Sequence, residues 1–190
     1  MKEQIKNLTA NKKLLLHVCC APCTSAVLEK VKAFDTTLYY YNPNTYPSDE
    51  YTLRFKQFKL LKNLNLDYKI VLEKYNHSEF LDLITGLENE AEGGLRCEKC
   101  IRLRLEKSFQ YAKANSFDFV TTSLSISPHK NAEFINSCGK ELEQIYGVKF
   151  LFSDFKKENG YLNSIKISKE LNMYRQEYCG CEFSFNKKER

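Results

Sequence analysis

Short apolar runs alternate with helical patterns along most of this chain. The runs are rich in β-forming side chains and predict five strands, over residues 13–18, 37–41, 66–72, 118–123 and 148–152. Between and after them, apolar residues recur at intervals of three and four and predict helices, over residues 24–34, 50–63, 77–87, 97–115, 131–146 and 162–172.

The order of these elements predicts an α/β fold. Strands that alternate with helices form an open, mostly parallel sheet with helices on both faces. We expect a single domain over residues 1–190. It would have a polar lead-in at 1–13, an α/β core at 14–153, and a C-terminal helix with a cysteine-bearing tail at 154–190.

Three polar loops follow strands of this predicted sheet. The first contains Cys19, Cys20 and Cys23, the second spans 42–44 and the third spans 127–130. Because parallel strands place their carboxyl ends at one edge, all three loops should lie at that edge. Helices begin there too, and a helix N-terminus favours the thiolate, which is the form that binds metals or acts as a nucleophile.

Composition narrows the class of protein further. The 190 residues are 43% hydrophobic and 28% charged, which is ordinary for a soluble globular protein, and the net charge of +5 is compatible with a phosphate-bearing partner. The apolar run at 14–23 is too short to span a bilayer, and residues 1–13 lack the apolar core of a signal peptide. We therefore expect a cytoplasmic protein that does not enter a membrane.

Cysteines carry the candidate chemistry. Seven of the eight occur in three short groups: Cys19, Cys20 and Cys23; Cys97 and Cys100; Cys179 and Cys181. In a reducing compartment such spacing favours metal binding or redox exchange over a disulfide framework. Four thiolates can hold a zinc ion or an iron–sulfur cluster. Seven would suit a cluster with an adjacent second metal ion, or a cluster with a dithiol that cycles to a disulfide.

The eighth cysteine, Cys138, has a different setting. It falls within the apolar pattern of the predicted helix at 131–146. A buried free cysteine behaves as a small hydrophobic residue, so we expect Cys138 to belong to the core rather than to the site.

Six motifs occur in order between residues 14 and 184. They are HVCCAPC at 17–23, YNPN at 41–44, EYxxR at 50–54, RCxxC at 96–100, TTSLxISP at 121–128 and YRQxYCGC at 174–181. Together they resemble the cobalamin-independent epoxyqueuosine reductases over nearly the whole chain. The first and last motifs are the most specific.

The resemblance implies a tRNA-modifying oxidoreductase. This family reduces the epoxide of epoxyqueuosine at the wobble position of the anticodon to give queuosine, and its fold is related to the adenine-nucleotide α-hydrolase group. It carries a [4Fe–4S] cluster beside a single metal ion, either iron or zinc. The metal ligands that the motifs imply are Cys19, Cys20, Cys23, Cys97 and Cys100. Cys179 and Cys181 become further ligands or a catalytic redox pair.

The reaction also needs protons and a way to hold RNA. Tyr41, Tyr174 and His129 are candidate proton donors. The residues expected to contact substrate, through base edges, the cyclopentene diol or phosphates, are Asn42, Asn44, Arg54, Lys130, Arg175 and Gln176. The expected partners are a tRNA with a queuosine-type anticodon loop and an electron-donor protein.

Two other functions stay open at this point. A zinc-stabilised RNA-binding module would use the two CxxC pairs structurally and would be colourless. A thiol–disulfide oxidoreductase would use Cys179 and Cys181 and bind no metal. The sequence leaves open which cysteines hold the cluster and which hold the second ion. It also leaves open the proton donor, the electron donor and the oligomeric state.

Overall fold

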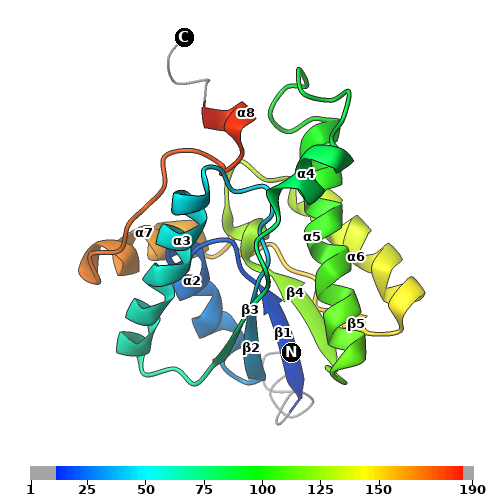
Figure 1. The fold of residues 1–190 in the computed structure, drawn as a ribbon. Coiled ribbons are helices and arrows are strands. Elements are labelled where there is room, and N and C mark those ends of the chain that lie inside the picture. The colour runs from blue at the N-terminus through cyan, green and yellow to red at the C-terminus, as the bar shows by residue number, and fades with distance from the viewer. Residues whose placement is uncertain (1–11, 186–190) are drawn as a thin grey trace.

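A computed structural model describes residues 12–185 and contains a five-stranded sheet (Figure 1). The strands are β1 (Lys13–His17), β2 (Asp35–Tyr40), β3 (Lys69–Leu72), β4 (Phe119–Thr122) and β5 (Lys149–Phe150). All pairings are parallel, in the order β3-β2-β1-β4-β5. β1 therefore lies at the centre of the sheet, between β2 and β4. Most of the predicted lead-in, residues 1–11, lies outside the described residues.

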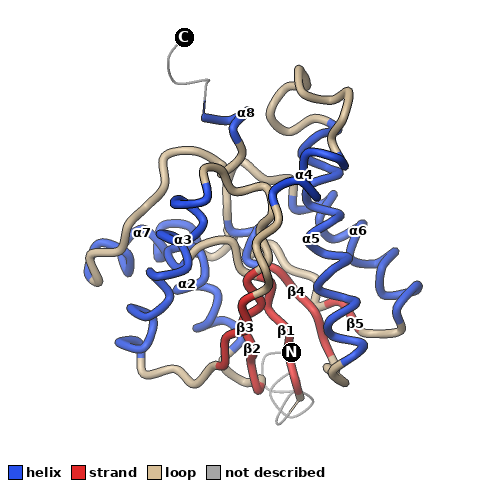
Figure 2. The backbone as a smooth tube through the Cα atoms, viewed as in Figure 1, coloured by secondary structure: helices blue, strands red, loops and turns tan. Residues whose placement is uncertain are grey.

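Helices connect the strands (Figure 2). They are α2 (Ala21–Val31), α3 (Ser48–Lys56), α4 (His77–Leu83), α5 (Leu95–Ala114), α6 (Ala132–Tyr146), α7 (Gly160–Glu170) and α8 (Glu182–Phe185), with 3-10 helices η1 (Gln57–Leu64) and η2 (Ser123–Ile126). The predicted α/β fold with a parallel sheet is confirmed. The predicted boundaries of lead-in, core and tail remain a prediction.

Alternate residues of β1 face the two helical layers. Leu14 and Leu16 pack on the side covered by α2, whereas Leu15 packs on the side covered by α5 and α6. In Figure 1, α2, α3 and α7 cover one face of the sheet, and α5 and α6 cover the other. All three leucines are fully buried. Burial on both faces explains why this strand is a continuous apolar run in the sequence.

Three predicted helices begin or end at other residues in the structure. α2 begins at Ala21 rather than at residue 24, because Pro22 occupies the first turn, where its fixed φ and missing N–H are tolerated. Cys23 therefore lies in the helix and not in the loop before it. The helix predicted at 50–63 begins at Ser48 and continues as the 3-10 segment η1, and the one predicted at 77–87 ends at Leu83.

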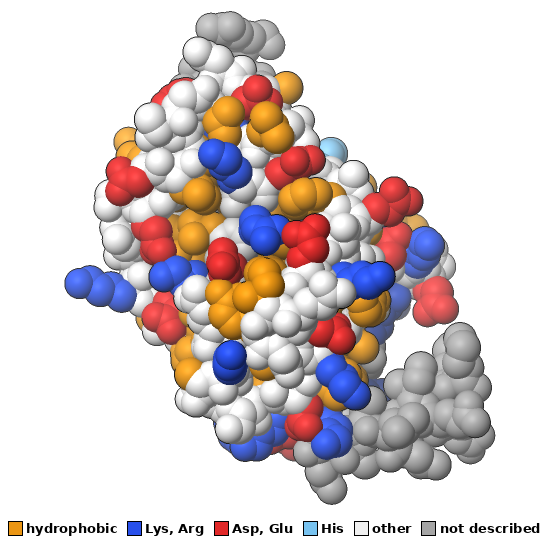
Figure 3. Space-filling model, turned by 90° about the vertical axis from the view of Figure 1, so that its right-hand side faces the viewer, with side chains coloured by type: hydrophobic (Ala, Val, Ile, Leu, Met, Phe, Trp, Pro, Cys, Tyr) orange, Lys and Arg blue, Asp and Glu red, His pale blue; other side chains and the backbone are white. Residues whose placement is uncertain are grey.

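The surface carries charges of both signs. Figure 3 shows basic and acidic side chains interspersed over the face that lies to the right in Figure 1. Within residues 12–185, no helix combines the length and the apolar character needed to cross a membrane.

Gly160, the first residue of α7, has no room for a side chain. A methyl group there would lie 1.8 Å from the carbonyl oxygen of Phe155. We expect Gly160→Ala to lower the free energy of unfolding by about 1–3 kcal/mol, because the backbone must move to relieve the overlap. Urea denaturation followed by circular dichroism measures this. The exposed Asn163→Ala on the same helix is the control, expected within about 0.5 kcal/mol of the parent protein. Equal midpoints for the two variants would contradict this packing.

Candidate active site and metal centre

The turn after β1 brings three cysteines together. Cys19 lies in the turn, Cys20 is the N-cap residue of α2, and Cys23 lies in its first turn. Their Sγ atoms lie within 4.8 Å of one another, and those of Cys19 and Cys20 are 3.8 Å apart. We call these residues the first thiol group. Because β1 ends at His17 and the helix begins at once, the three thiols share a single chain turn at the carboxyl edge of the sheet.

Two segments remote in sequence contact the first thiol group. From the end of β4, the Ser123 hydroxyl lies 3.7 Å from the Sγ of Cys19 and accepts a hydrogen bond from the Cys19 amide at 3.4 Å. From the C-terminal tail, the side-chain amide of Gln176 donates to the Sγ of Cys20 at 3.2 Å. Hydrogen-bond donors next to sulfur favour the thiolate form.

The three cysteines of the first thiol group differ in pKa. Hydrogen bonds from Cys20 and Cys23 hold the pKa of Cys19 well below its usual value. The pKa of Cys20 is raised to about 12, mainly because its thiol donates to Cys19. The pKa of Cys23 is raised for the same reason. The arrangement favours one thiolate, on Cys19, flanked by two thiols.

His17 joins the ends of three strands behind this group. Its Nε2 lies 3.1 Å from the Tyr41 carbonyl, which can only accept, so Nε2 carries the proton. Its Nδ1 accepts from the Thr122 hydroxyl at 2.9 Å. The side chain is fully buried, and this burial lowers the pKa of the imidazole to about 4. His17 is therefore a neutral residue that orders the loop and does not face a ligand.

Four further cysteines surround a second, smaller cavity. Cys97 and Cys100 come from the start of α5, and Cys179 and Cys181 come from the tail; all four line this cavity. We call them the second thiol group. The Sγ of Cys179 also accepts a hydrogen bond from the Lys130 ammonium group at 3.0 Å. The polar groups that meet at this edge of the sheet therefore include the cysteines of the C-terminal tail, although no strand precedes the tail to position it.

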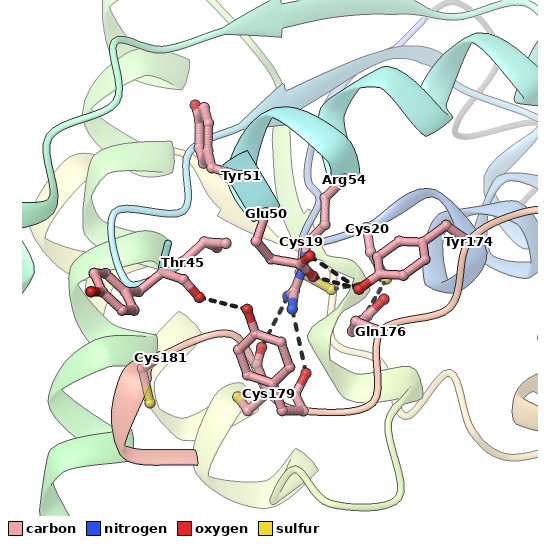
Figure 4. A network of polar contacts seen from close by, with 12 residues as sticks. Cys19, Cys20, Thr45, Glu50, Tyr51, Arg54, Tyr174, Gln176, Cys179 and Cys181 are labelled. Carbon is pink, nitrogen blue, oxygen red and sulfur yellow. Dashed lines mark hydrogen bonds and ion pairs between the residues drawn. The ribbon is translucent and has the colours of Figure 1, made fainter. Parts of the chain in front are cut away.

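A buried ion pair positions that tail (Figure 4). Arg54 Nε donates to Glu50 Oε1 at 2.7 Å, and both side chains are almost inaccessible to water. The other guanidinium nitrogens donate to the carbonyls of Tyr178 and Cys179, at 3.4 and 3.1 Å. The Tyr174 hydroxyl donates to the Glu50 carboxylate at 3.0 Å. We call this arrangement the Glu50–Arg54 clamp, and it fixes the backbone beside Cys179.

Gly180, between the two tail cysteines, lets the chain pass close to the clamp. Its φ of +134° is a value that side chains disfavour, and a methyl group there would lie 2.9 Å from Arg54 Nη1. Its carbonyl accepts a hydrogen bond from the Tyr46 amide at 2.8 Å. The glycine therefore allows both neighbouring cysteines to face the second cavity.

A cavity of about 470 Å³ is lined by members of both thiol groups, namely Cys19, Cys23 and Cys179. The other lining side chains include cations, aromatic rings and an amide, from Arg104, Lys130, Arg175, Tyr161, Tyr178 and Gln176. Its volume is typical of a pocket for one small ligand. The cavity thus presents thiols, positive charges and aromatic rings to the same ligand.

Known proteins match this chain along nearly its whole length. A family model described as "Epoxyqueuosine reductase QueH" matches residues 14–187. The chain belongs to the QueH family. A QueH relative from Streptococcus pyogenes is 42% identical over 177 residues, which are 90% of this chain and 69% of the relative. QueH relatives from Staphylococcus epidermidis and Thermotoga maritima are 39% and 38% identical, over 76% and 89% of their lengths and 90% of this chain. The three are named epoxyqueuosine reductases, so membership confirms the motif-based resemblance and makes this chain an oxidoreductase.

Several predicted residues of this QueH chain lie together. Lys130, Arg175, Gln176 and the exposed His129 line the larger cavity with the thiols. Asn44 lines the smaller one, and its Oδ1 is buried without a partner among residues 12–185. These positions are consistent with a ligand site, and the individual roles stay predictions.

Four other predicted residues are buried or bonded away from both cavities. Asn42 is buried and donates to the Val18 carbonyl at 2.9 Å. Arg54 and Tyr174 belong to the clamp, and the Tyr41 hydroxyl is buried without a partner in the described part of the chain. Neither cavity has any of the four among its lining residues. Their suggested roles in proton donation or substrate binding stay predictions.

Sequence reasoning missed Arg104 and Ser123, which line the larger cavity. Arg104 follows Cys100 by four residues in α5, so both lie on the same face of the helix. That spacing is the signal that could have identified it. Ser123 directly follows β4, at the edge where ligands bind in such sheets.

Cys138 is the cysteine outside both groups. It is 2% exposed and packs in the core with Ile135 and Leu142, which confirms its predicted place. Cys138→Ala should lower the free energy of unfolding by about 1 kcal/mol through lost packing, while metal content stays that of the parent protein. Urea denaturation and metal analysis test this. A loss of metal in this variant would show that the two thiol groups do not form the whole centre.

Proposed function

We propose that this chain reduces epoxyqueuosine at the wobble position of tRNA to queuosine, the activity for which its relatives are named. In this reaction two electrons and two protons enter and both C–O bonds of the epoxide break. A carbon–carbon double bond forms, and the oxygen leaves as water. One observation carries the proposal: in a QueH-family chain, both thiol groups border one cavity large enough for a modified base.

The first thiol group suits a single metal ion. A tetrahedral ion with metal–sulfur bonds of about 2.3 Å separates its thiolates by about 3.8 Å. The Sγ atoms of Cys19 and Cys20 are 3.8 Å apart, and Cys23 lies within 4.8 Å of both. Three protein ligands leave a fourth position for water or substrate, as in catalytic sites. We therefore assign the single ion, iron or zinc, to these three cysteines.

The second thiol group has the donor set of an iron–sulfur cluster, since four cysteines are the usual ligands of [4Fe–4S]. The smaller cavity has a volume of only about 10 Å³, so the cavity must widen for a cluster to fit between the two cysteine pairs. On this assignment the two tail cysteines are ligands and not a redox disulfide. When bound, the two centres would supply single electrons and Lewis acidity toward the epoxide oxygen.

Protein side chains would hold the substrate oxygen and its charge. Burial lowers the pKa of Lys130, but the Coulombic interaction and hydrogen bond with Cys179 raise it further, so the pKa lies above its ordinary value and the ammonium stays charged. Lys130 Nζ lies 3.0 Å from Cys179 Sγ at the wall of the larger cavity. An ammonium there can donate a hydrogen bond to the oxygen as negative charge develops on it.

Aromatic and basic side chains suit the RNA part of the substrate. Single-stranded anticodon bases are bound by stacking on aromatic rings and by contacts of cations with phosphate. Tyr161, Tyr178 and Arg175 line the larger cavity. The Tyr178 ring is held by Arg54, whose guanidinium carbon lies 5.2 Å from the ring centroid. We infer that these three residues contact the anticodon loop.

The two alternative functions are less well supported. A structural zinc site is closed by its four protein ligands, whereas Cys19, Cys23 and Cys179 border an open cavity. A thiol–disulfide oxidoreductase needs only the tail pair and leaves the first thiol group without a purpose.

Anaerobic purification followed by an assay tests the proposal. We expect a brown protein with a broad absorption band, stoichiometric sulfide and more iron than one cluster holds. It should convert epoxyqueuosine to queuosine in tRNA, detected by mass spectrometry of the nucleosides. A colourless protein with a single zinc and no sulfide after anaerobic reconstitution would favour the RNA-binding module. A metal-free protein that reduces generic disulfides would favour the thiol–disulfide oxidoreductase.

A further inference from the structure

Arg104 occupies a position that none of the roles above explains. Arg104 lines both the larger cavity, with Cys19 and Cys23 of the first thiol group, and the smaller one, with all four cysteines of the second. Only 3% of the residue is exposed. Its Nε donates to the carbonyl of Cys100 at 3.1 Å, within the same helix.

Within residues 12–185, the other two buried arginines, Arg54 and Arg96, each have three oxygen acceptors, whereas Arg104 has the single carbonyl of Cys100. Arg54 is paired with the Glu50 carboxylate. Arg96, on the same helix as Arg104, donates to three backbone carbonyls of the 87–90 loop. For Arg104, no ion pair with a carboxylate is found within residues 12–185. A buried charge without a counter-charge is strongly destabilising.

Cysteine side chains share both cavities with Arg104: Cys19, Cys23 and Cys179 line the larger one, and Cys97, Cys100, Cys179 and Cys181 line the smaller one. Burial lowers the pKa of its guanidinium, and Coulombic interactions with Cys100, Cys179, Cys19 and Cys97 in their ionised forms raise it, in that order of effect. These four residues come from both thiol groups. The guanidinium is also beyond the reach of titration in the physiological range, so its charge is permanent.

We propose that Arg104 is a positioning residue that supplies the permanent counter-charge of the thiolate-bound redox centre and raises its reduction potential. It does so without binding a metal. A fixed positive charge stabilises the reduced, more negative form of a thiolate-held centre, since net charge and nearby dipoles set such potentials. The inference rests on the proposed function, because it requires a redox centre held by these cysteines.

The test compares four variants of the anaerobically reconstituted protein. Arg104→Gln and Arg104→Met remove the charge, and Arg104→Lys keeps it. Arg102→Gln removes the same charge from the same helix at a partly exposed position, where Arg102 pairs with Glu141 at 2.7 Å. The readouts are iron and sulfide content, the midpoint potential from a redox titration followed by absorption, and the rise in melting temperature on metal loading.

We expect the neutral Arg104 variants to load iron but to be harder to reduce. Their equilibrium constant for one-electron reduction should fall at least tenfold, a shift of about 59 mV to more negative potential. Metal loading should also raise their melting temperature less than it raises that of the parent protein. Arg104→Lys and Arg102→Gln should stay close to the parent in both measurements.

Two results would overturn the inference. One is an Arg104→Gln potential equal to that of Arg102→Gln in fully loaded protein. The other is that Arg104→Gln, Arg104→Met and Arg104→Lys all fail to fold. Arg104 would then have a purely structural role, through its hydrogen bond to the Cys100 carbonyl. Failure of the proposed function looks different, because the parent protein itself would then lack iron and sulfide.

Discussion

Cys20→Ser should abolish metal binding by the first thiol group and lower reductase activity at least 100-fold, since even changes around a metal ligand cost about 10–100-fold. A hydroxyl is a poor replacement for a thiolate toward iron or zinc. Cys20 is the N-cap residue of α2 and makes no side-chain capping bond. Serine is a preferred N-cap residue, so the metal-free variant should unfold at the same denaturant concentration as the metal-free parent or at a higher one.

Metal analysis, the tRNA assay and urea denaturation together check this prediction. The matched control is Cys138→Ala, which changes a buried cysteine outside both thiol groups and should keep metal and activity. If Cys20→Ser retained the metal content and turnover of the parent, the first thiol group would not be a metal site. If the metal-free variant were less stable than the metal-free parent, the loss of activity would report unfolding instead.

Arg54→Met should lower the free energy of unfolding by about 3–5 kcal/mol, because it leaves the buried Glu50 carboxylate without its charge partner. Both side chains of this pair are nearly inaccessible to water, and their N–O distance is 2.7 Å. The variant also removes the donors to the Tyr178 and Cys179 carbonyls. We therefore expect it to lose metal from the second thiol group even where it remains folded.

Urea denaturation and iron content measure these two effects. The control is Lys107→Met, which breaks a surface pair with Glu79 whose N–O distance is 3.1 Å and should cost less than about 1 kcal/mol. Adding Glu50→Gln to Arg54→Met should recover part of the stability, since the stranded charge is gone, but not the metal content. A stability loss no greater than that of the control would show that the clamp is not needed for the fold.

The EYxxR motif at 50–54 is a case in which the local sequence pattern does not predict the structural role of its residues. Glu50 and Arg54 are four residues apart, and this spacing predicts an ordinary ion pair on a helix. The other interpretation of the motif is that Arg54 binds substrate. In the structure the pair is buried because the tail, more than a hundred residues later, covers it and takes its remaining hydrogen bonds. No periodicity or spacing encodes that contact.

The sequence by itself determined the alternation of strands and helices, the burial of β1 on both faces and the three short cysteine groups. These features follow from local patterns: side-chain period, turn chemistry and the spacing of thiols. It also determined that the loops after β1, β2 and β4 share one edge, because this holds for any parallel sheet.

Only the tertiary structure decided which of these groups meet. The strand order places β1 between β2 and β4, and so brings Ser123 to Cys19. The tail has no strand to set its path, and long-range hydrogen bonds to Arg54 place its cysteines opposite those of α5. The buried charge of Arg104 became visible in the same way, since burial and missing partners are properties of packing between segments. Contacts between residues far apart in sequence depend on how the whole chain packs, and a local pattern does not specify them.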